Sequence, residues 1–278
     1  MSERREAEEL EELEISLLLE GLHRWYGIDL RDYARGALRR HLVECLQQEQ
    51  IATVSGFQDK VLHDTSCLDR LLLALSLSGT TMFRDPAFYL ALRTRIVPLL
   101  RTFPFVRLWL AGCSTGEEIY SLAILLEEEG LYSRSRIYAT DLSREAVRRA
   151  REGVFPLAGV REYTSNYLHS GGRRYLSDYY KLREGHISFA SELKRNITFS
   201  EHNLATDGSF NEFQVVLCRN ILSQFNPLLQ ERVHELIYES LDTFGVLGLG
   251  SQESLKYSPR EAFYEPLDQG CRLYRKVL

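Results

Sequence analysis

One stretch of the chain, residues 106–118, has the sequence VRLWLAGCSTGEE. Its apolar first half, Val106 to Ala111, is typical of a short buried strand. After a glycine-containing turn, residues 117–129 place apolar side chains at the spacing of an amphipathic helix. The stretch therefore predicts a strand, a turn and a helix in direct succession.

The turn itself indicates a nucleotide-like ligand. Gly112 and Gly116 allow the backbone to approach a ligand closely, and a helix that begins at Glu117 offers unpaired N–H groups with partial positive charge. The glycine spacing departs from the G-x-G-x-x-G pattern of dinucleotide-binding turns, and the Lys-Ser/Thr pair of a phosphate-binding P-loop is absent. The turn thus disfavours NAD and ATP.

Strands and helices continue to alternate toward the C-terminus. Strands are predicted at 136–140, 213–218 and 246–250, and helices at 144–152, with Ser143 as N-cap, and at 229–243. Such alternation is typical of an α/β fold, a doubly wound and mainly parallel sheet with helices on both faces.

Polar residues fall at the ends of these strands. Asp141 follows the second strand, where an acidic side chain can accept hydrogen bonds from two ribose hydroxyls. Asn203, Arg219 and Asn220 are also placed at strand ends, and ligands of open parallel sheets bind outside that edge. Each Asn is equally consistent with a turn, and Asp141 with a helix cap. We expect the group to gather at one edge and hold the ligand.

The rest of the chain is predicted to form other units. Residues 1–78 are predicted to be an N-terminal helical domain, with an acidic first helix and a second helix over 31–50. Residues 79–104 are predicted to be a linker and connecting helix, and 105–278 the α/β domain. Within that domain, 153–196 is rich in Tyr, Gly and Arg and is interpreted either as an insertion that contacts a partner or as a cover over the sheet edge.

Composition excludes several classes of function. The 278 residues are 44% hydrophobic and 26% charged, as in ordinary globular proteins, and a net charge of -5 argues against nucleic acid as the substrate. No apolar run reaches the ~20 residues that span a bilayer, so we expect a cytoplasmic protein without membrane insertion. Five single cysteines predict reduced thiols and no metal site. We expect a monomer.

Short motifs along nearly the whole chain resemble one known family. In order, they are YGIDL at 26–30, TTMFRD at 80–85, GCSTGEEIY at 112–120, ATDLS at 139–143, HNL at 202–204 and LCRN at 217–220. Together they resemble the chemotaxis receptor protein-glutamate methyltransferases, usually called CheR. The resemblance implies a Rossmann-like class I methyltransferase domain, an N-terminal helical domain and a small inserted β-subdomain.

The resemblance also implies a reaction. The cofactor would be S-adenosyl-L-methionine, with S-adenosyl-L-homocysteine as product, and the acceptors would be glutamate side chains on the cytoplasmic domain of a methyl-accepting chemoreceptor or similar signalling protein. The cofactor-binding residues would include the two glycines of the turn. The full set is Ser78, Thr80, Arg84, Gly112, Gly116, Glu117, Asp141, Asn203, Leu204, Arg219 and Asn220. Arg84 would lie close to the transferred methyl and orient the acceptor carboxylate.

Two positions depart from the family pattern. Ser78 stands where the family usually has an Asn that helps bind the cofactor, and Gln224 stands where it usually has a Tyr near the methyl. We assign Arg84 and Gln224 to the catalytic centre. One hypothesis is an active protein-glutamate methyltransferase, and another is a cofactor-binding scaffold or regulator that has lost most catalysis. A small-molecule or RNA methyltransferase is disfavoured, because the resemblance extends into the N-terminal part.

A basic stripe is the candidate surface for docking the acceptor. Arg31, Arg35 and Arg39 are spaced by four, with Arg40 beside the last, and are predicted to lie along one side of the second helix. Such a stripe would attract an acidic receptor helix. It is equally consistent with a solvated helix face that is balanced by the Glu-rich first helix.

Overall fold

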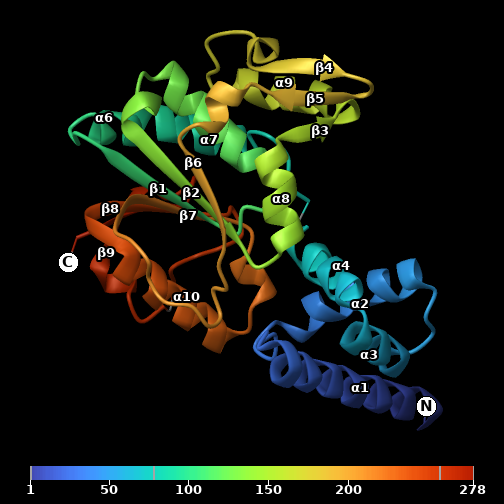
Figure 1. Ribbon diagram of the computed structural model, residues 1–278. Coiled ribbons are helices and arrows are strands. Elements are labelled where there is room, and N and C mark those ends of the chain that lie inside the picture. Colours follow the sequence, from blue (N-terminus) through green and yellow to red (C-terminus); the bar gives the residue numbers. More distant parts are fainter. Residues whose placement is uncertain (1, 78, 257, 278) are drawn as a thin grey trace.

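A computed structural model describes residues 2–77, 79–256 and 258–277, with side chains from residue 5 onward (Figure 1). Its first part is helical: α1 Ser2–Tyr26, α2 Arg35–Glu49, α3 Val54–His63 and α4 Thr65–Ser76. We call these four helices and the loops between them the helical unit. Thr53 and Asp64 cap α3 and α4 by accepting the N–H groups of Gly56 and Ser66.

The second helix begins at Arg35 and not at Arg31, so the predicted start was wrong. The residues before it pair instead with a distant segment: the Ala34 N–H donates to the Gln224 carbonyl oxygen at 2.7 Å. Tyr33 forms an antiparallel bridge with Phe225. Because these backbone groups are used across the chain, they cannot also serve a helix, and α2 starts after them.

The connecting segment is helical for most of its length. It contains α5 Pro86–Ala91, a π-helical turn Leu92–Ile96 and α6 Val97–Leu100. Pro86 occupies the first turn of α5, where its missing N–H costs nothing. This segment leads from the helical unit into the sheet.

A seven-stranded sheet forms the centre of the molecule, with the order β6-β2-β1-β7-β8-β10-β9. The strands are β1 Val106–Ala111, β2 Ser135–Asp141, β6 Ile197–Glu201, β7 Phe213–Cys218, β8 Leu241–Leu249, β9 Tyr264–Asp268 and β10 Leu273–Lys276. The first five in this order pair in parallel, and β10 pairs antiparallel with both β8 and β9. The predicted α/β class with a mainly parallel sheet is confirmed.

Three helices pack beside the large sheet: α7 Glu117–Glu128, α8 Arg144–Glu152 and α10 Pro227–Ser240. The predicted N-cap of α8 is confirmed, since the Ser143 hydroxyl accepts the Ala146 N–H at 3.2 Å. The predicted end of the last helix at 243 was wrong, because β8 already begins at Leu241. Strands β6, β9 and β10 were not predicted.

A second sheet lies within the interval 153–196. Its three strands, β3 Val154–Pro156, β4 Tyr180–Arg183 and β5 His186–Phe189, are antiparallel in the order β3-β5-β4, and α9 Val160–His169 separates β3 from β4. Figure 1 shows this small sheet at the end of the molecule opposite the helical unit. Short 3-10 turns lie at Tyr132–Arg134, Leu157–Gly159, Leu176–Tyr179, Ser191–Lys194, Leu222–Gln224 and Glu261–Phe263.

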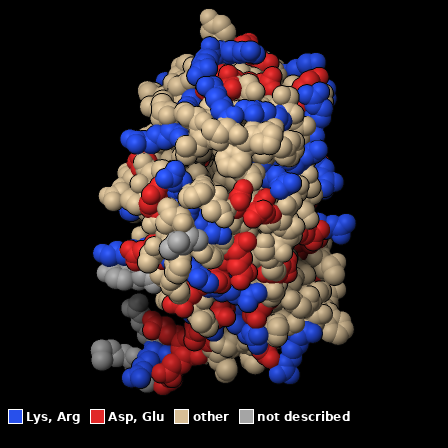
Figure 2. Space-filling model, turned by 90° about the vertical axis from the view of Figure 1, so that its left-hand side faces the viewer, with Lys and Arg blue, Asp and Glu red and all other residues tan. Residues whose placement is uncertain are grey.

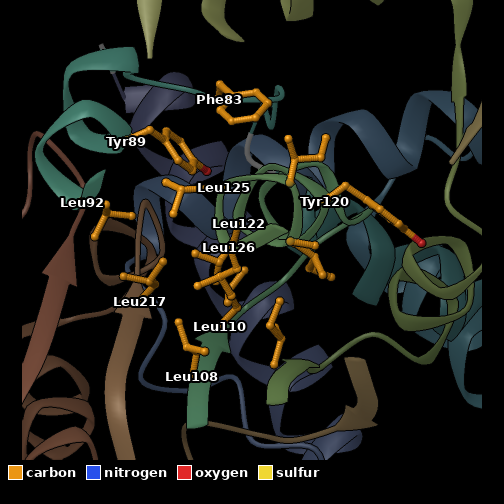
Figure 3. Close-up of a cluster of buried hydrophobic side chains, with 14 of the residues drawn as sticks. Phe83, Tyr89, Leu92, Leu108, Leu110, Tyr120, Leu122, Leu125, Leu126 and Leu217 are labelled. Atoms are coloured by element: carbon orange, nitrogen blue, oxygen red, sulfur yellow. The ribbon is translucent and has the colours of Figure 1, made fainter. Parts of the chain in front are cut away.

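Two hydrophobic cores lie on opposite faces of the large sheet. Leu108 and Leu110 of β1 face the core that contains α5, α6 and α7 (Figure 3). Trp109 and Ala111 face the other core, which contains α10 and side chains of all four N-terminal helices. The helical unit therefore shares a core with the sheet. Among the described helices, none has the length and apolar character needed to cross a membrane.

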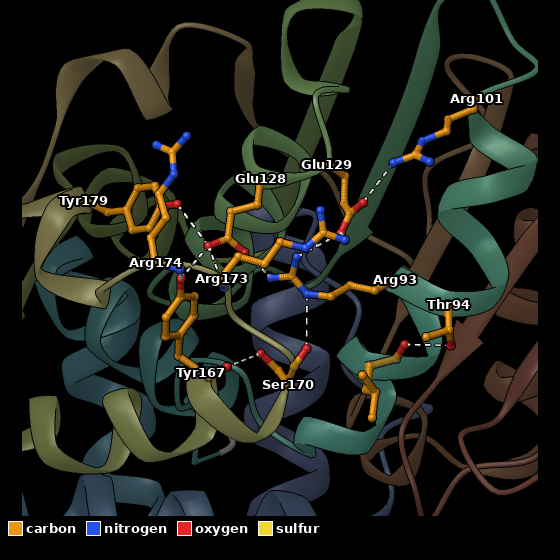
Figure 4. Close-up of polar contacts among 11 residues, drawn as sticks. Arg93, Thr94, Arg101, Glu128, Glu129, Tyr167, Ser170, Arg173, Arg174 and Tyr179 are labelled. Carbon is orange, nitrogen blue, oxygen red and sulfur yellow. Dashed lines mark hydrogen bonds and ion pairs between the residues drawn. The ribbon is translucent and has the colours of Figure 1, made fainter.

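A buried network of charges attaches the small sheet and α9 to the rest (Figure 4). The Glu129 carboxylate pairs with Arg93 at 3.1 Å, with Arg101 at 3.0 Å and with Arg173 at 2.8 Å. The neighbouring Glu128 accepts hydrogen bonds from the hydroxyl groups of Tyr167 and Tyr179. Both carboxylates are almost completely buried, with side chains 1% and 2% exposed, so each needs these partners.

We expect Glu129→Ala to lower the free energy of unfolding by about 1–3 kcal/mol, because the buried Arg93 loses one of its two carboxylate partners and keeps only Glu128. Urea denaturation followed by circular dichroism measures this. Glu127→Ala, an exposed glutamate on the same helix, is the matched control and should change stability by less than ~0.5 kcal/mol. Equal effects of the two variants would contradict a stabilising role for the network.

A second expectation concerns acid stability. Burial lowers the pKa of His234, on α10, from 6.5 to about 4. A depressed pKa stabilises the fold above pH 6.5, and this stability is lost as the pH falls toward 4, at about 1.4 kcal/mol per unit. His234→Gln should therefore show a shallower loss of stability between pH 6.5 and 4 than the wild type. Parallel curves for the two proteins would show that His234 does not titrate in this way.

Candidate functional site

The carboxyl ends of β2, β1 and β7 lie side by side, because these three strands are neighbours in the sheet. Loop 112–116 follows β1, Asp141 ends β2, and Arg219 and Asn220 follow β7. Residues whose sequence positions span more than a hundred residues are thus brought to one edge. This is the edge at which parallel sheets bind their ligands.

The loop after β1 is shaped by two glycines with positive φ. At Gly112, where φ is +71°, a Cβ atom would stand 2.0 Å from Cδ1 of Ile221. At Gly116, where φ is +105°, it would stand 2.9 Å from Cα of Ala150 on α8. Gly112 therefore allows Ile221 to pack against the loop, whereas Gly116 is required for the packing of the loop against α8.

Asp141 is buried and already holds three protein groups. Its Oδ2 accepts the Ser114 N–H at 2.9 Å, and its Oδ1 accepts the Ser143 N–H at 2.9 Å and the Ser76 hydroxyl at 2.6 Å. Burial raises the pKa of this carboxyl, and the hydrogen bonds oppose that rise. Asp141 thus fixes loop 112–116 and ties it to α4. Oδ1 already accepts two hydrogen bonds, so a ribose hydroxyl would use the remaining acceptor capacity of Oδ2.

An apolar recess opens beside Asp141. Its lining consists of Tyr33, Leu75, Ser76, Gly112, Asp141, Leu142, His202, Leu204, Ile221, Gln224 and Phe225. Most of these side chains are apolar or aromatic, and the acid lies at one margin. This combination suits a nucleoside, whose flat base needs apolar walls and whose ribose needs an acceptor.

A polar recess lies on the other side of Gly112. Its lining consists of Thr80, Thr81, Arg84, Gly112, Cys113, Ser114, Glu118, Arg219 and Asn220. The hydroxyls of Thr81 and Ser114 and Nε of Arg219 are buried there without a hydrogen-bond partner among the described residues. Buried polar groups are normally satisfied, so these three atoms indicate a missing polar ligand.

The two recesses together fit S-adenosylmethionine. The apolar recess would hold its nucleoside, and the polar recess would hold its amino-acid end, with hydroxyl and guanidinium donors for the carboxylate and Glu118 for the ammonium group. Because both recesses are lined by Gly112, a single elongated ligand would pass from one to the other at this residue.

Arg219 was expected to contact the cofactor, but its guanidinium is already engaged. Nη1 donates to Glu118 at 2.7 Å, and Nη2 donates to Asp85 at 2.7 Å and to the Arg84 carbonyl oxygen at 3.3 Å. The guanidinium also lies over the Phe88 ring, 4.0 Å from its centroid. Arg219 lines the polar recess, yet two of these three hydrogen bonds go to residues 84 and 85.

That segment carries Arg84, which lines the polar recess. Phe83 and Asp85, on either side of it, both have positive φ, at +51° and +58°. Such conformations are unfavourable for residues other than glycine and persist only where neighbours enforce them. Here Arg219 holds the carbonyl oxygen of Arg84, and the Ser121 hydroxyl accepts the Phe83 N–H at 2.9 Å.

Glu117 lines neither recess, and its expected contact with the cofactor stays a prediction. Its carboxylate accepts the Thr115 hydroxyl at 2.7 Å and a further hydrogen bond from Thr80. Burial raises the pKa of Glu117, while these hydrogen bonds oppose the rise. Glu117 therefore stabilises the loop from within. Thr80, which bonds to it, does line the polar recess.

The two asparagines differ. The Asn203 side-chain oxygen accepts the Ala205 N–H at 2.9 Å, so this residue forms a turn and lines neither recess. The adjacent Leu204 is buried and lines the apolar recess. Asn220 lines the polar recess, and its backbone N–H donates to Glu253 at 2.8 Å. Asn203 thus forms a turn, and a contact of Asn220 with the cofactor stays a prediction.

Gln224 lines the apolar recess, and its backbone carbonyl oxygen accepts the Ala34 N–H of the helical unit. It belongs to the short 3-10 turn Leu222–Gln224 and is half-buried. Ser78, the other position that departs from the family pattern, lies outside the described residues.

The basic stripe is largely paired with α1. Arg31 precedes α2 and pairs with Asp29 and Glu20, so its predicted place on the helix was wrong. Arg35 pairs with Glu12, and Arg39 pairs with Glu11. Arg40 is exposed. On the face that Figure 2 shows, acidic and basic side chains are interleaved. The structure thus favours the interpretation of a face balanced by the first helix.

Several residues of the two recesses were not predicted. Tyr33, Leu75 and Ser76 come from the helical unit, and Thr81, Ser114, Glu118 and His202 from the motifs around the expected contacts. The last four lie next to predicted residues, so a wider window would have included them. Tyr33 offered no such signal, because its place depends on pairing with a segment some 190 residues later.

Comparison with known families identifies both parts of the chain. Residues 78–268 match the family described as "CheR methyltransferase, SAM binding domain". Residues 13–76 match "CheR methyltransferase, all-alpha domain". The two matches follow each other without overlap and together span most of the chain.

Individual relatives agree with these matches. A protein of Pseudomonas putida named "Putative methyltransferase Cher3" is 45% identical over 265 residues, which cover 95% of this chain and 97% of that protein. The chemotaxis protein methyltransferase of Salmonella typhimurium is 27% identical, with 84% of this chain and 81% of that protein covered. Among solved structures, the N-methyltransferase NodS of Bradyrhizobium japonicum in complex with S-adenosyl-L-homocysteine is a distant match, at 12% identity and a TM-score of 0.34 over 62% of this chain and 63% of that one.

The junction of the two recesses can be tested at Gly112. We expect Gly112→Ala to weaken S-adenosylhomocysteine binding at least tenfold, because the added Cβ displaces Ile221 into the apolar recess. Ile221→Val removes the clashing Cδ1 and should restore part of the affinity in the double variant. Isothermal titration calorimetry measures both effects.

Gly27→Ala is the matched control for this variant, because Gly27 has the same φ of +71° but nothing within 4 Å of an added Cβ. Backbone strain alone would affect both variants, whereas loss of affinity should follow only the change at 112. Undiminished affinity of Gly112→Ala would mean that the ligand does not pass this corner.

Proposed function

Since the chain belongs to the CheR methyltransferase family, we propose that it transfers the methyl group of S-adenosylmethionine to glutamate side chains of a chemoreceptor or related signalling protein. S-adenosylmethionine is the cofactor of the family domain that spans residues 78–268. The observation that supports the proposal most directly is the pair of recesses joined at Gly112, with Arg84 on the polar one. We place the reaction in the cytoplasm, on the cytoplasmic domain of a methyl-accepting receptor.

The chemistry asks little of the protein in proton transfer. When bound, the cofactor supplies a methyl group on a positively charged sulfur. A glutamate, with a reference pKa near 4.3, is already ionised at neutral pH and needs no general base. A carbon–oxygen bond forms as the carbon–sulfur bond breaks, and the electron pair stays on sulfur. The products are a glutamate methyl ester and S-adenosylhomocysteine.

Positioning is then the main task of the site. Aligned reactants can lower a barrier by about 7–11 kcal/mol relative to free ones. Arg84 would hold the acceptor carboxylate by hydrogen bonds and charge, at the point where its segment is fixed by Arg219 and Ser121. The apolar side chains around Asp141 exclude water, which favours a step that brings opposite charges together.

A second candidate function is a cofactor-binding scaffold or regulator with little turnover. The observation that favours it is Gln224, which gives the apolar recess an amide in place of the phenol that the resemblance leads one to expect.

Two measurements on the same protein separate the candidates. Calorimetry with S-adenosylhomocysteine measures binding, and transfer of labelled methyl to the purified cytoplasmic domain of a receptor from the same organism measures turnover. Glutamate methyl esters release methanol in mild base, whereas N-methyl groups do not, so the released label identifies the acceptor. An enzyme gives both signals, and a scaffold gives binding alone. Absence of binding would contradict both.

For the active enzyme we expect Arg84→Ala to lower kcat/KM at least a hundredfold, because the acceptor loses the group that orients it. Arg232→Ala, an exposed arginine of α10 that lines neither recess, is the control and should stay within threefold of the wild type. Wild-type kcat/KM in Arg84→Ala would remove this arginine from the mechanism.

A further inference from the structure

One wall of the apolar recess is supplied by the helical unit. Tyr33, Leu75 and Ser76 line the recess from that side, and Gln224 and Phe225 line it from the sheet side. Tyr33 is 8% exposed, so it is set into the wall rather than lying on the surface. A ligand in the recess would therefore touch both parts of the chain at once.

The ring of Tyr33 and the backbone next to it are held in place by residues 224–226. It packs edge-on against Phe225, with ring centroids 5.0 Å apart and an interplanar angle of 77°. The backbone on either side is fixed as well: Ala34 donates to Gln224 at 2.7 Å, and Asp32 accepts from the backbone and side chain of Asn226 at 2.8 and 2.9 Å. The position of this ring is thus determined by the contact between the two parts of the chain.

A second tie joins the helical unit to the recess at Asp141. The Ser76 hydroxyl, in the last turn of α4, donates to the Asp141 carboxylate at 2.6 Å. Burial and the nearby Asp141 carboxylate raise the pKa of the Tyr33 phenol well above 10, so that it remains a hydrogen-bond donor at neutral pH. The helical unit therefore presents an aromatic face and two hydroxyl groups to one small space.

We propose that Tyr33 contacts the nucleoside of the bound cofactor. Through this contact the cofactor would stabilise the packing of the helical unit against residues 224–226, and that packing would in turn stabilise cofactor binding. The inference rests on the proposed cofactor site. A ligand that touches both sides of an interface binds more tightly when the two sides are packed together. By the reciprocity of linked equilibria, its binding must then favour that packing. An acceptor that binds the helical unit would then act on cofactor affinity through the same contact.

A purely structural role for Tyr33 makes a different prediction. If the ring served only to pack against Phe225, its loss would lower stability but leave the affinity of the folded protein for the cofactor unchanged. If it contacts the nucleoside, affinity falls even in protein that is fully folded. Binding and stability must therefore be measured separately, on the full chain.

The experiment uses S-adenosylhomocysteine as the probe. Tyr33→Leu should weaken its binding at least tenfold by calorimetry, and Tyr33→Phe, which keeps the ring, should weaken it less than threefold. Tyr26→Leu is the matched control, since Tyr26 lies in the same unit, bonds to the Val61 carbonyl oxygen and is not part of the recess. It should bind the probe like the wild type. Thermal melting without ligand reports folding of each variant.

Hydrogen exchange supplies a test that needs no variant. In the wild type, S-adenosylhomocysteine should slow exchange of the amides of Ala34 and Asn226, whose hydrogen bonds cross the interface. Wild-type affinity in a folded Tyr33→Leu, or unchanged exchange at these amides in the saturated protein, would overturn the inference. If instead the wild type fails to bind the probe, the proposed function falls with it, so the two failures are distinguishable.

Discussion

The constraint on which the site depends is the burial of the Arg219 cation. Its side chain is 1% exposed, and removing a charge from water costs several kcal/mol unless the charge is paired. The pairs come from three places: Glu118 in the first turn of α7, Asp85, and the carbonyl oxygen of Arg84. The end of β7, the start of α7 and the connecting segment are consequently locked to one another. The unfavourable backbone at 83 and 85 is maintained by this lock, and with it the position of Arg84.

Asp141 plays the corresponding part on the other side of Gly112. Its carboxylate holds the Ser114 amide of the loop, the Ser143 amide of α8 and the Ser76 hydroxyl of α4. A single buried acid therefore connects three elements around the apolar recess, as Arg219 does around the polar recess. The parallel sheet explains why this is possible, since β2, β1 and β7 deliver the acid, the loop and the arginine to the same edge. Each of the two halves of the site is thus organised by one buried charged group.

Those parts of the structure that depend on local pattern could be predicted from the sequence. The limits of β1, β7 and α8 follow from continuous apolar runs and a Ser cap, and the polar residues after them were expected at one edge. Strands β9 and β10 escaped prediction because they pair antiparallel near the edge of the sheet and are only partly buried, so they lack a long apolar run. The hydrogen-bond partners of Arg219, Glu117 and Asn203 depend on which residues fold beside them, so these contacts could not be predicted. Tyr33 belongs to the same class, since its bridge to Phe225 joins residues far apart in the chain.

The same reasoning explains why the arginines near α2 are poor candidates for a preformed docking surface. A stripe of like charges is unfavourable alone, and the Glu-rich α1 lies close enough to pair with Arg35 and Arg39. Both pairs are exposed, so each contributes little to stability, with a median near 0–1 kcal/mol for such pairs. An acidic acceptor could therefore replace Glu11 and Glu12 at small cost, but it would gain correspondingly little from charge alone. Charge on this face therefore contributes little to the choice of acceptor.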